Sequence, residues 1–160
     1  MSADLKDYRA ARRTFIAACE AAGVDTIARV HPAKAADGKP LFMDSAALGP
    51  RLATKAVVAI AHDLPGSQAL TQLLQEPIPL PPGARLVLVH APDPAAFAGM
   101  ASDAHWALAS LSAMATEDLS KVTGPVVLNL NGGIALALPG AMMADVPARA
   151  DRIRTELAAL

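Results

Sequence analysis

Several residue types and patterns are scarce in this sequence, and each scarcity narrows what the chain can be. The 160 residues contain one cysteine, so no disulfide can form within the chain, and aromatic residues make up only 3%. Charged residues amount to 18% and the formal net charge is −1, without any run of lysine or arginine. Nucleic acid is therefore not expected as a partner. No apolar run approaches the ~20 residues that span a bilayer, so no membrane contact is expected.

Small aliphatic residues dominate what remains. Hydrophobic residues make up 53% of the chain, a content that suits closely packed helices on a sheet rather than a disordered segment. The length suits one domain with its own core, and we expect a single α/β domain over residues 1–160. Residues 1–13 are polar and charged, which does not resemble a secretory signal. We expect a cytoplasmic protein in which Cys19 is a buried small hydrophobe.

The order of the apolar patterns predicts an N-terminal helix, then a hairpin, then alternating strands and helices. Apolar side chains recur at helical spacing over residues 4–22, and Gly23 stands where a helix-ending glycine belongs. Strands are predicted at 24–30, 40–46, 56–61, 85–90, 125–130 and 134–138, and helices at 67–75, 102–121 and 147–159. This alternation indicates an α/β three-layer sandwich with a mostly parallel sheet and helices on both faces.

Polar residues follow three of the predicted buried strands. In open α/β sheets, ligands bind beyond the carboxyl ends of the strands, so these residues could share one edge. The predicted ligand-binding residues are His62, Asp63, His90, Asp93 and Asn131. The alternative is ordinary loop chemistry, because any chain returns to solvent at its strand ends.

Motifs for common catalytic and cofactor chemistry are missing. The four histidines form no close His-x-x-His or His-x-x-Glu pair, so we predict no metal; a site built from His62, Asp63 and His90 stays an alternative. Ser67 lacks the Gly-x-Ser-x-Gly elbow of serine hydrolases, and we interpret it as a helix cap. No catalytic residue is assigned, and no cofactor is predicted because the glycine-rich nucleotide fingerprints are absent.

Several short motifs follow one another in a recognisable order. They are Tyr8-Arg9-Ala10-Ala11-Arg12, Ala21-Ala22-Gly23, Gly38-Lys39-Pro40-Leu41, Leu80-Pro81-Pro82-Gly83 and Val89-His90-Ala91-Pro92-Asp93-Pro94. By their order and spacing, residues 7 to about 98 resemble a branch of bacterial zinc-carboxypeptidase-like proteins of unassigned function.

The resemblance implies an α/β fold and places the family's first zinc ligand at His62. The second ligand, a glutamate three residues later, falls at Pro65, which offers no carboxylate. The family's downstream substrate-binding stretch has no counterpart at residues 102–109, and its remaining ligand and general base would be expected beyond the end of this chain. The resemblance therefore implies the fold without the activity.

A second likeness covers the later part of the chain. The segments Asp103-Ala104-His105-Trp106, Gly124-Pro125-Val126-Val127-Leu128-Asn129 and Pro139-Gly140 look like the later part of short-chain dehydrogenase/reductases. The Tyr-x-x-x-Lys pair and the glycine-rich fingerprint of those enzymes are absent here. This likeness implies a Rossmann-like fold that also lacks its catalytic residues.

Three functional hypotheses follow from these observations. The leading one is a non-catalytic, shortened zinc-carboxypeptidase-like domain that acts as a binding or assembly module, with a protein partner or as a homo-oligomer. The second is a hydrolase with a rebuilt site at the strand ends that uses His62, Asp63 and His90. The third is a Rossmann-like accessory subunit.

Overall fold

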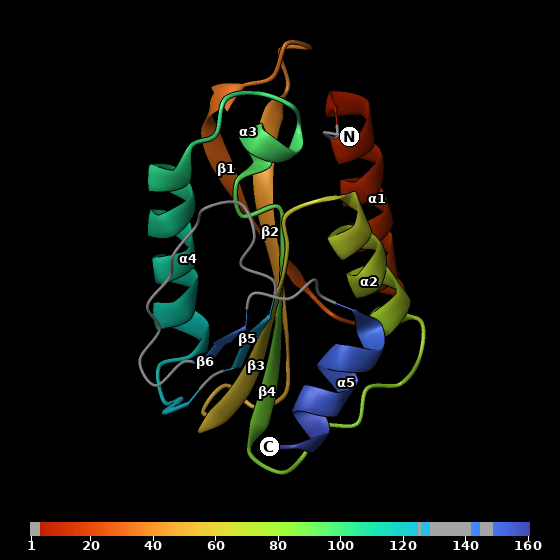
Figure 1. Ribbon diagram of the computed structural model, residues 1–160, viewed down its shortest axis with the longest axis vertical. Coiled ribbons are helices and arrows are strands. Elements are labelled where there is room, and N and C mark those ends of the chain that lie inside the picture. The colour runs from red at the N-terminus through yellow and green to blue at the C-terminus, as the bar shows by residue number, and fades with distance from the viewer. Residues whose placement is uncertain (1–3, 125, 129–141, 145–148) are drawn as a thin grey trace.

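A six-stranded mixed sheet forms the centre of the computed structural model, which describes residues 4–124, 126–128, 142–144 and 149–160 (Figure 1). The strand order is β1-β2-β4-β3-β5-β6. The strands are β1 (Thr26–Lys34), β2 (Pro40–Leu48), β3 (Lys55–Ala61), β4 (Ala84–His90), β5 (Val126–Leu128) and β6 (Met142–Ala144). The helices are α1 (Leu5–Ala21), α2 (Leu64–Leu74), α3 (Pro94–Phe97), α4 (Ala104–Asp118) and α5 (Ala150–Ala158).

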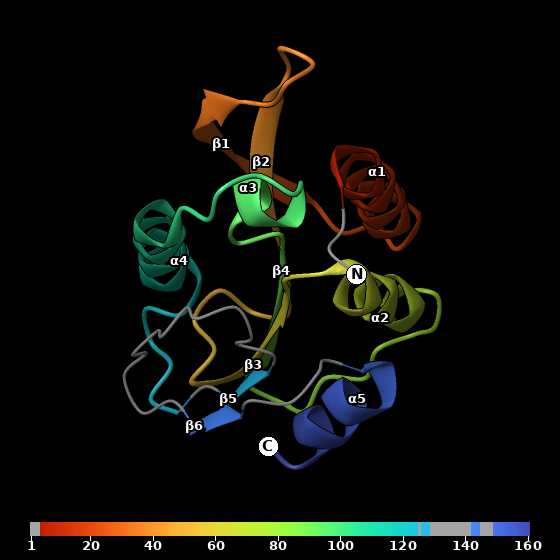
Figure 2. The same cartoon turned by 45° about the horizontal axis from the view of Figure 1, so that its top comes forward.

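Helices cover both faces of the sheet, which confirms the expected three-layer α/β architecture (Figure 2). Helices α1, α2 and α5 lie on one face, where Phe15, Leu70 and Ile153 pack against alternate residues of β3 and β4. Helix α4 lies on the other face, where Leu111 and Met114 pack against the intervening residues. None of the described helices is long and apolar enough to cross a membrane.

Pairing directions divide the sheet into two parts. Strand β3 pairs in parallel with β4 and β5, and β5 pairs in parallel with β6. Strands β1, β2 and β4 pair antiparallel, because β1 and β2 form a hairpin whose second strand lies beside β4. The predicted N-terminal helix, hairpin and mostly parallel sheet are therefore confirmed.

The N-terminal hairpin is longer than the sequence predicted. Strand β1 continues to Lys34 through Pro32, although the prediction ended the strand at Val30. Pro32 is tolerated because β1 forms one edge of the described sheet, where an outward-facing N–H needs no partner. The register shifts between Val30 and Lys34, and the turn falls at the expected Asp37-Gly38 pair.

The start of helix α2 differs from the prediction. The Asp63 carboxylate accepts a hydrogen bond from the Gly66 N–H at 2.8 Å, so Asp63 caps the helix and the assignment of Ser67 as the cap was wrong. Pro65 occupies the first turn, where its missing N–H costs nothing. The four-residue helix α3 was not predicted, because so short a helix has no readable periodicity.

Other boundaries agree within a few residues. Asp103 caps α4, as one of the two predicted candidates, and Gly23 ends α1 with a positive φ of 71°. The predicted strand at 134–138 and the helix-opening Pro147 lie outside the described residues, and α5 begins at Ala150.

Candidate functional site

The carboxyl ends of β3 and β4 meet at one edge of the sheet. The two strands are parallel and in register, with Ala61 opposite His90. Four of the predicted site residues therefore belong to two adjacent segments, His62-Asp63 after β3 and His90 to Asp93 at the end of β4. The fifth, Asn131, lies outside the described residues.

His90 is fully buried between the sheet and helices α1 and α2. Its Nε2 shares a hydrogen bond of 2.8 Å with the Ser67 Oγ, and its ring stacks on Phe15 with centroids 5.0 Å apart. Burial lowers the pKa of His90 to about 3, and the nearby charge of Arg12 acts in the same direction. His90 is therefore neutral near pH 7 and is packed as a core residue.

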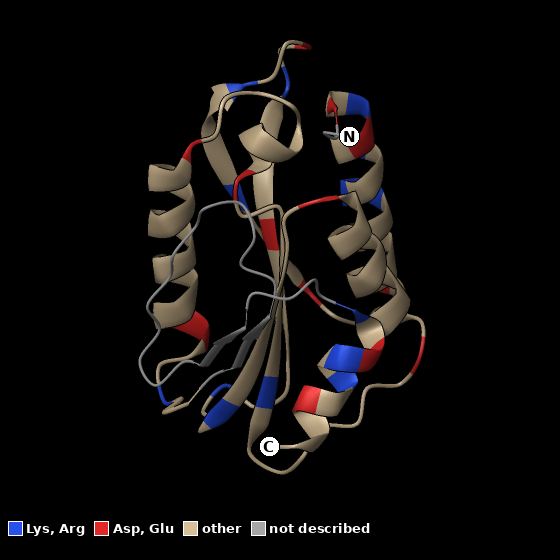
Figure 3. Ribbon diagram, viewed as in Figure 1, with Lys and Arg blue, Asp and Glu red and all other residues tan. Residues whose placement is uncertain are grey.

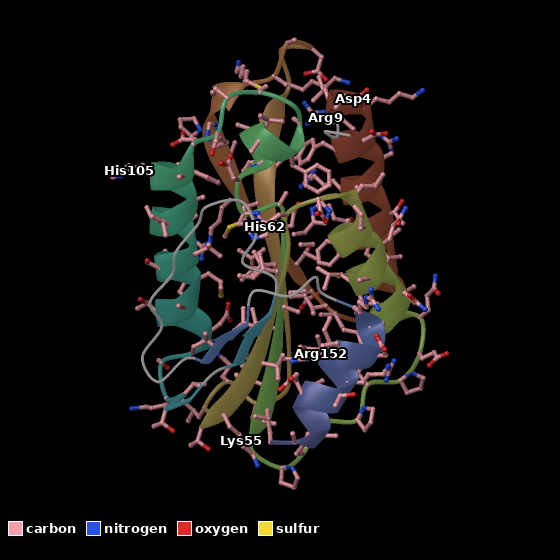
Figure 4. All side chains as sticks on the ribbon, viewed as in Figure 1. Asp4, Arg9, Lys55, His62, His105 and Arg152 are labelled. Atoms are coloured by element: carbon pink, nitrogen blue, oxygen red, sulfur yellow. The ribbon has the colours of Figure 1, made fainter. Side chains whose placement is uncertain are left out.

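His62 lies one residue beyond the end of β3. Since Ala61 is paired with His90 and successive side chains of a strand alternate between faces, the pleat directs His62 toward the face that α4 covers. Figure 4 labels His62 near the middle of the molecule, whereas His105 points outward from α4. The two strand-end histidines therefore point into different layers of the sandwich.

The two predicted aspartates cap helices. Asp63 is exposed and caps α2 through Gly66, as described above. Asp93 is buried, and its carboxylate accepts hydrogen bonds from the Ala96 N–H at 3.1 Å, the Ser102 hydroxyl at 2.7 Å and the Asp103 N–H at 2.9 Å. These bonds hold the loop around α3 and leave Asp93 little capacity for a ligand.

A metal-binding cluster is not formed by these groups. Within the ranges that the structure describes, no three histidine, cysteine, aspartate or glutamate residues lie close enough together to hold a metal ion. The alternative zinc site from His62, Asp63 and His90 thus has no geometric support, since His90 faces α2 and Asp63 caps it.

A buried polar cluster beneath α1 was missed by the sequence analysis. The Arg12 guanidinium donates to both carboxylate oxygens of the fully buried Asp44, at 2.7 and 3.0 Å, and lies 4.1 Å from the centroid of the Phe42 ring. The Tyr8 hydroxyl donates to the Phe42 carbonyl and accepts from the Phe42 N–H. Asp44 is opposite His90 in the β2–β4 pairing, so this cluster adjoins the Ser67–His90 pair. An aspartate within an apolar strand was the available signal.

A groove of about 360 Å³ lies between α1 and α2. Thr14 of α1 and Thr71 and Gln72 of α2 line it, and Ser67 contributes to the lining although only 2% of Ser67 is exposed. The groove therefore reaches His90 only through Ser67.

A known family matches a region that contains most of these groups. The model of the family described as "Protein of unknown function (DUF2817)" matches residues 5–102, which is more than half of the chain. The chain belongs to the DUF2817 family. For this DUF2817 domain the match runs from α1 through α3, so it includes His62, Ser67, His90 and Asp93. No curated protein matches the sequence.

Solved structures are similar to this DUF2817 domain at low identity. A glutaminyl cyclase from Macrostomum lignano is 18% identical with a TM-score of 0.52, over 82% of this chain and 49% of that chain. A glutaminyl cyclase from Porphyromonas gingivalis is 17% identical with a TM-score of 0.46, over 78% of this chain and 51% of that chain. The DUF2817 chain spans about half the length of these two enzymes. At 18% identity, the likeness to the Macrostomum lignano structure bears on the fold alone.

Proposed function

We propose that this chain is a non-catalytic binding or assembly module, built as a single zinc-carboxypeptidase-like α/β domain. The observation that carries the proposal is the state of His90. Its Nε2 is bonded to Ser67, its ring is fully buried against Phe15, and its pKa is about 3. A general base working near neutral pH needs a pKa close to the operating pH and access to substrate, and His90 has neither.

The other groups at this edge of the sheet also support a non-catalytic role. Pro65 stands where the resemblance would require a second zinc ligand, in the first turn of α2. The Ser67–His90 pair lacks the orienting acid of a catalytic triad, because no described group bonds to the His90 Nδ1. The carboxylates of Asp63 and Asp93 cap helices.

The surface available for binding is the edge of the sheet that follows β3, formed by His62 and Asp63, which we call the rim. His62 is half-buried and Asp63 is exposed, so both can contact a ligand while the core remains intact. We assign partner contact to these two residues, with Asn131 as a further candidate, and take the partner to be another protein or a second copy of this chain.

The metal content of the purified chain tests the proposal. We expect far less than one zinc per chain by mass spectrometry and no hydrolysis of an N-acyl amino acid in the presence of added zinc. Pro65→Glu would rebuild the His-x-x-Glu spacing and serves as the positive comparison, with His62→Ala in the same background as its control. Stoichiometric zinc in the unmodified chain, with hydrolysis that His62→Ala removes, would overturn the proposal.

The two kinds of partner are separated by the molar mass in solution. Light scattering on a size-exclusion column reports a dimer if the partner is a second copy. Asp63→Asn removes the charge but keeps the helix cap, and it should then shift the chain toward the monomer. A chain that stays monomeric and captures no partner, or a dimer that Asp63→Asn leaves unchanged, would contradict the assigned surface.

A further inference from the structure

A second hollow lies at the opposite end of β4 from His90. It has a volume of about 380 Å³ and sits between the β1–β2 edge of the sheet and the C-terminal end of α4. The residues that matter for its chemistry are Asp25, Ile27, Arg51, Arg85, Glu117 and Asp118. Arg85 is near the start of β4, so this cleft is separate from the rim after β3.

Two ion pairs form the walls of the cleft. The buried Arg85 donates to the Gly49 carbonyl at 2.8 Å and to Asp118 at 3.0 Å. Arg29 of β1 donates to Glu117 at 2.7 Å. These bonds tie the hairpin and β4 to the end of α4, so the cleft has a fixed frame.

Two further charges in the lining remain uncompensated. Asp25 and Arg51 are exposed and form no ion pair with any residue in the described ranges. After the two wall pairs are counted, the described residues of the cleft present one free carboxylate and one free guanidinium. A ligand that carries one positive and one negative group would match both.

The end of α4 favours a cation. Glu117 and Asp118 stand in its last turn, where no basic residue is present, and Figure 3 shows the acidic colour at this end. The last carbonyl groups of a helix carry partial negative charge, so acids there are unfavourable without nearby cations. Arg29 and Arg85 neutralise these two carboxylates, so the partial negative charge of the last carbonyl groups remains. A ligand ammonium group would be attracted by this remaining charge.

An apolar wall completes the cleft. Ile27 of β1 lines it and is 49% exposed, and Ala47 of β2 lies beside it in the lining. Ile27 shares its face of β1 with Arg29, which reaches α4, so its side chain faces the cleft and not the α1 layer. Burying this side chain under a ligand would remove apolar surface from water.

We propose that this cleft binds a free α-amino acid with an apolar side chain. Arg51 receives the carboxylate, Asp25 and the C-terminal end of α4 receive the ammonium group, and Ile27 contacts the side chain. The inference does not rest on the proposed binding role of the rim, because the two surfaces share no residue.

Calorimetric titration with L-leucine tests the assignment on the full chain. L-Leucinamide lacks the carboxylate and N-acetyl-L-leucine lacks the ammonium group, so each analogue loses one of the two charge contacts. We expect saturable binding of L-leucine and at least about tenfold weaker binding of both analogues, the loss typical of one charged hydrogen bond. No saturable binding of L-leucine up to about 10 mM, a limit above the millimolar range of weak small-molecule binding, would overturn the proposal.

Variants identify the cleft as the place of binding. Asp25→Asn and Arg51→Gln should each weaken L-leucine binding about fivefold or more, since each removes one charge, Asp25→Asn at nearly constant shape. Glu20→Gln and Arg13→Gln are matched controls, because both residues are exposed on α1 away from the cleft. Circular dichroism checks that all four variants are folded. Unchanged affinity in both cleft variants, or equal losses in the α1 controls, would contradict the assignment.

Discussion

Ser67 and His90 are joined by a buried hydrogen bond of 2.8 Å that ties the first half of α2 to the last residue of β4. The contact places two polar groups inside a layer of Leu, Ala and Phe side chains. Buried polar groups are stable in such a place only while they are paired. The bond therefore fixes where α2 lies on the sheet. It also occupies the His90 Nε2, so this nitrogen cannot bond to a substrate.

Ser67→Ala should lower the free energy of unfolding by about 1–3 kcal/mol, because the His90 Nε2 is left without a partner in the core. Urea denaturation measures the change. The matched control is Ser112→Ala on the exposed side of α4, which should stay within about 0.5 kcal/mol of the parent chain. Combining Ser67→Ala with His90→Leu should recover much of the loss, since both polar groups are then gone. A double variant that loses the sum of the two single effects would contradict this account.

The stability of the fold should fall as the pH decreases below about 6.5, the ordinary pKa of histidine. Burial lowers the pKa of His90 in the folded chain to about 3, so between these values the unfolded chain binds a proton that the folded chain does not. The unfolded state is therefore favoured progressively as the pH falls through this window. Denaturation at pH 4.5 and 7.5 should show a larger difference for the parent chain than for His90→Leu. Equal differences would assign the pH dependence to carboxylates instead.

Asp44→Asn should destabilise the chain by about 3 kcal/mol, because it leaves the Arg12 cation without its bidentate partner at a buried position. Asp44 is fully buried, while 22% of the Arg12 side chain is exposed, which keeps the expected loss near the lower end for buried pairs. Arg152→Gln breaks an exposed pair with Glu156 within α5 and should cost no more than about 0.5 kcal/mol. Thermal unfolding of both variants checks the contrast, and similar losses in the two would argue against it.

Gly49→Ala should be more harmful than Gly38→Ala, although both glycines have positive φ angles, of 99° and 76°. An added Cβ at Gly49 would lie 2.5 Å from the Ala84 carbonyl oxygen, whereas at Gly38 it would meet nothing within 4 Å. Gly38→Ala should cost about 1–2 kcal/mol for the left-handed backbone alone, and Gly49→Ala about 2 kcal/mol more for the clash. Gly49→Ala should also weaken L-leucine binding, because the Gly49 carbonyl holds Arg85 in the cleft. Equal melting temperatures would refute the clash.

The three-layer arrangement of helices on a sheet could be predicted because the buried strands have continuous apolar sequences. Residues 56–61 and 85–90 were placed within one residue of β3 and β4 for that reason. The start of α2 was misplaced because Asp63 and Ser67 are both acceptable capping residues, and only the first-turn preference of Pro65 distinguishes them.

The side-chain arrangement of the candidate site could not be predicted in the same way. His62 and His90 both end apolar runs, but they lie on different faces because the residue paired with His90 is Ala61, the neighbour of His62. Sequence spacing alone does not show which residue of β3 is paired with His90. The pairing of Arg12 with Asp44, across 32 positions of the chain, depends on how α1 crosses β2 and is equally hidden.

The irregular end of β1 has a consequence for how this protein behaves at high concentration. An exposed strand edge is a template on which other chains can extend a sheet, and Ile27 and Val30 make this edge partly apolar. Pro32 provides no N–H for such growth, and the register shift between Val30 and Lys34 bends the ladder away from a straight template. A strand added from solution would lose its pairing after Val30. The edge is therefore a poor template for fibre formation.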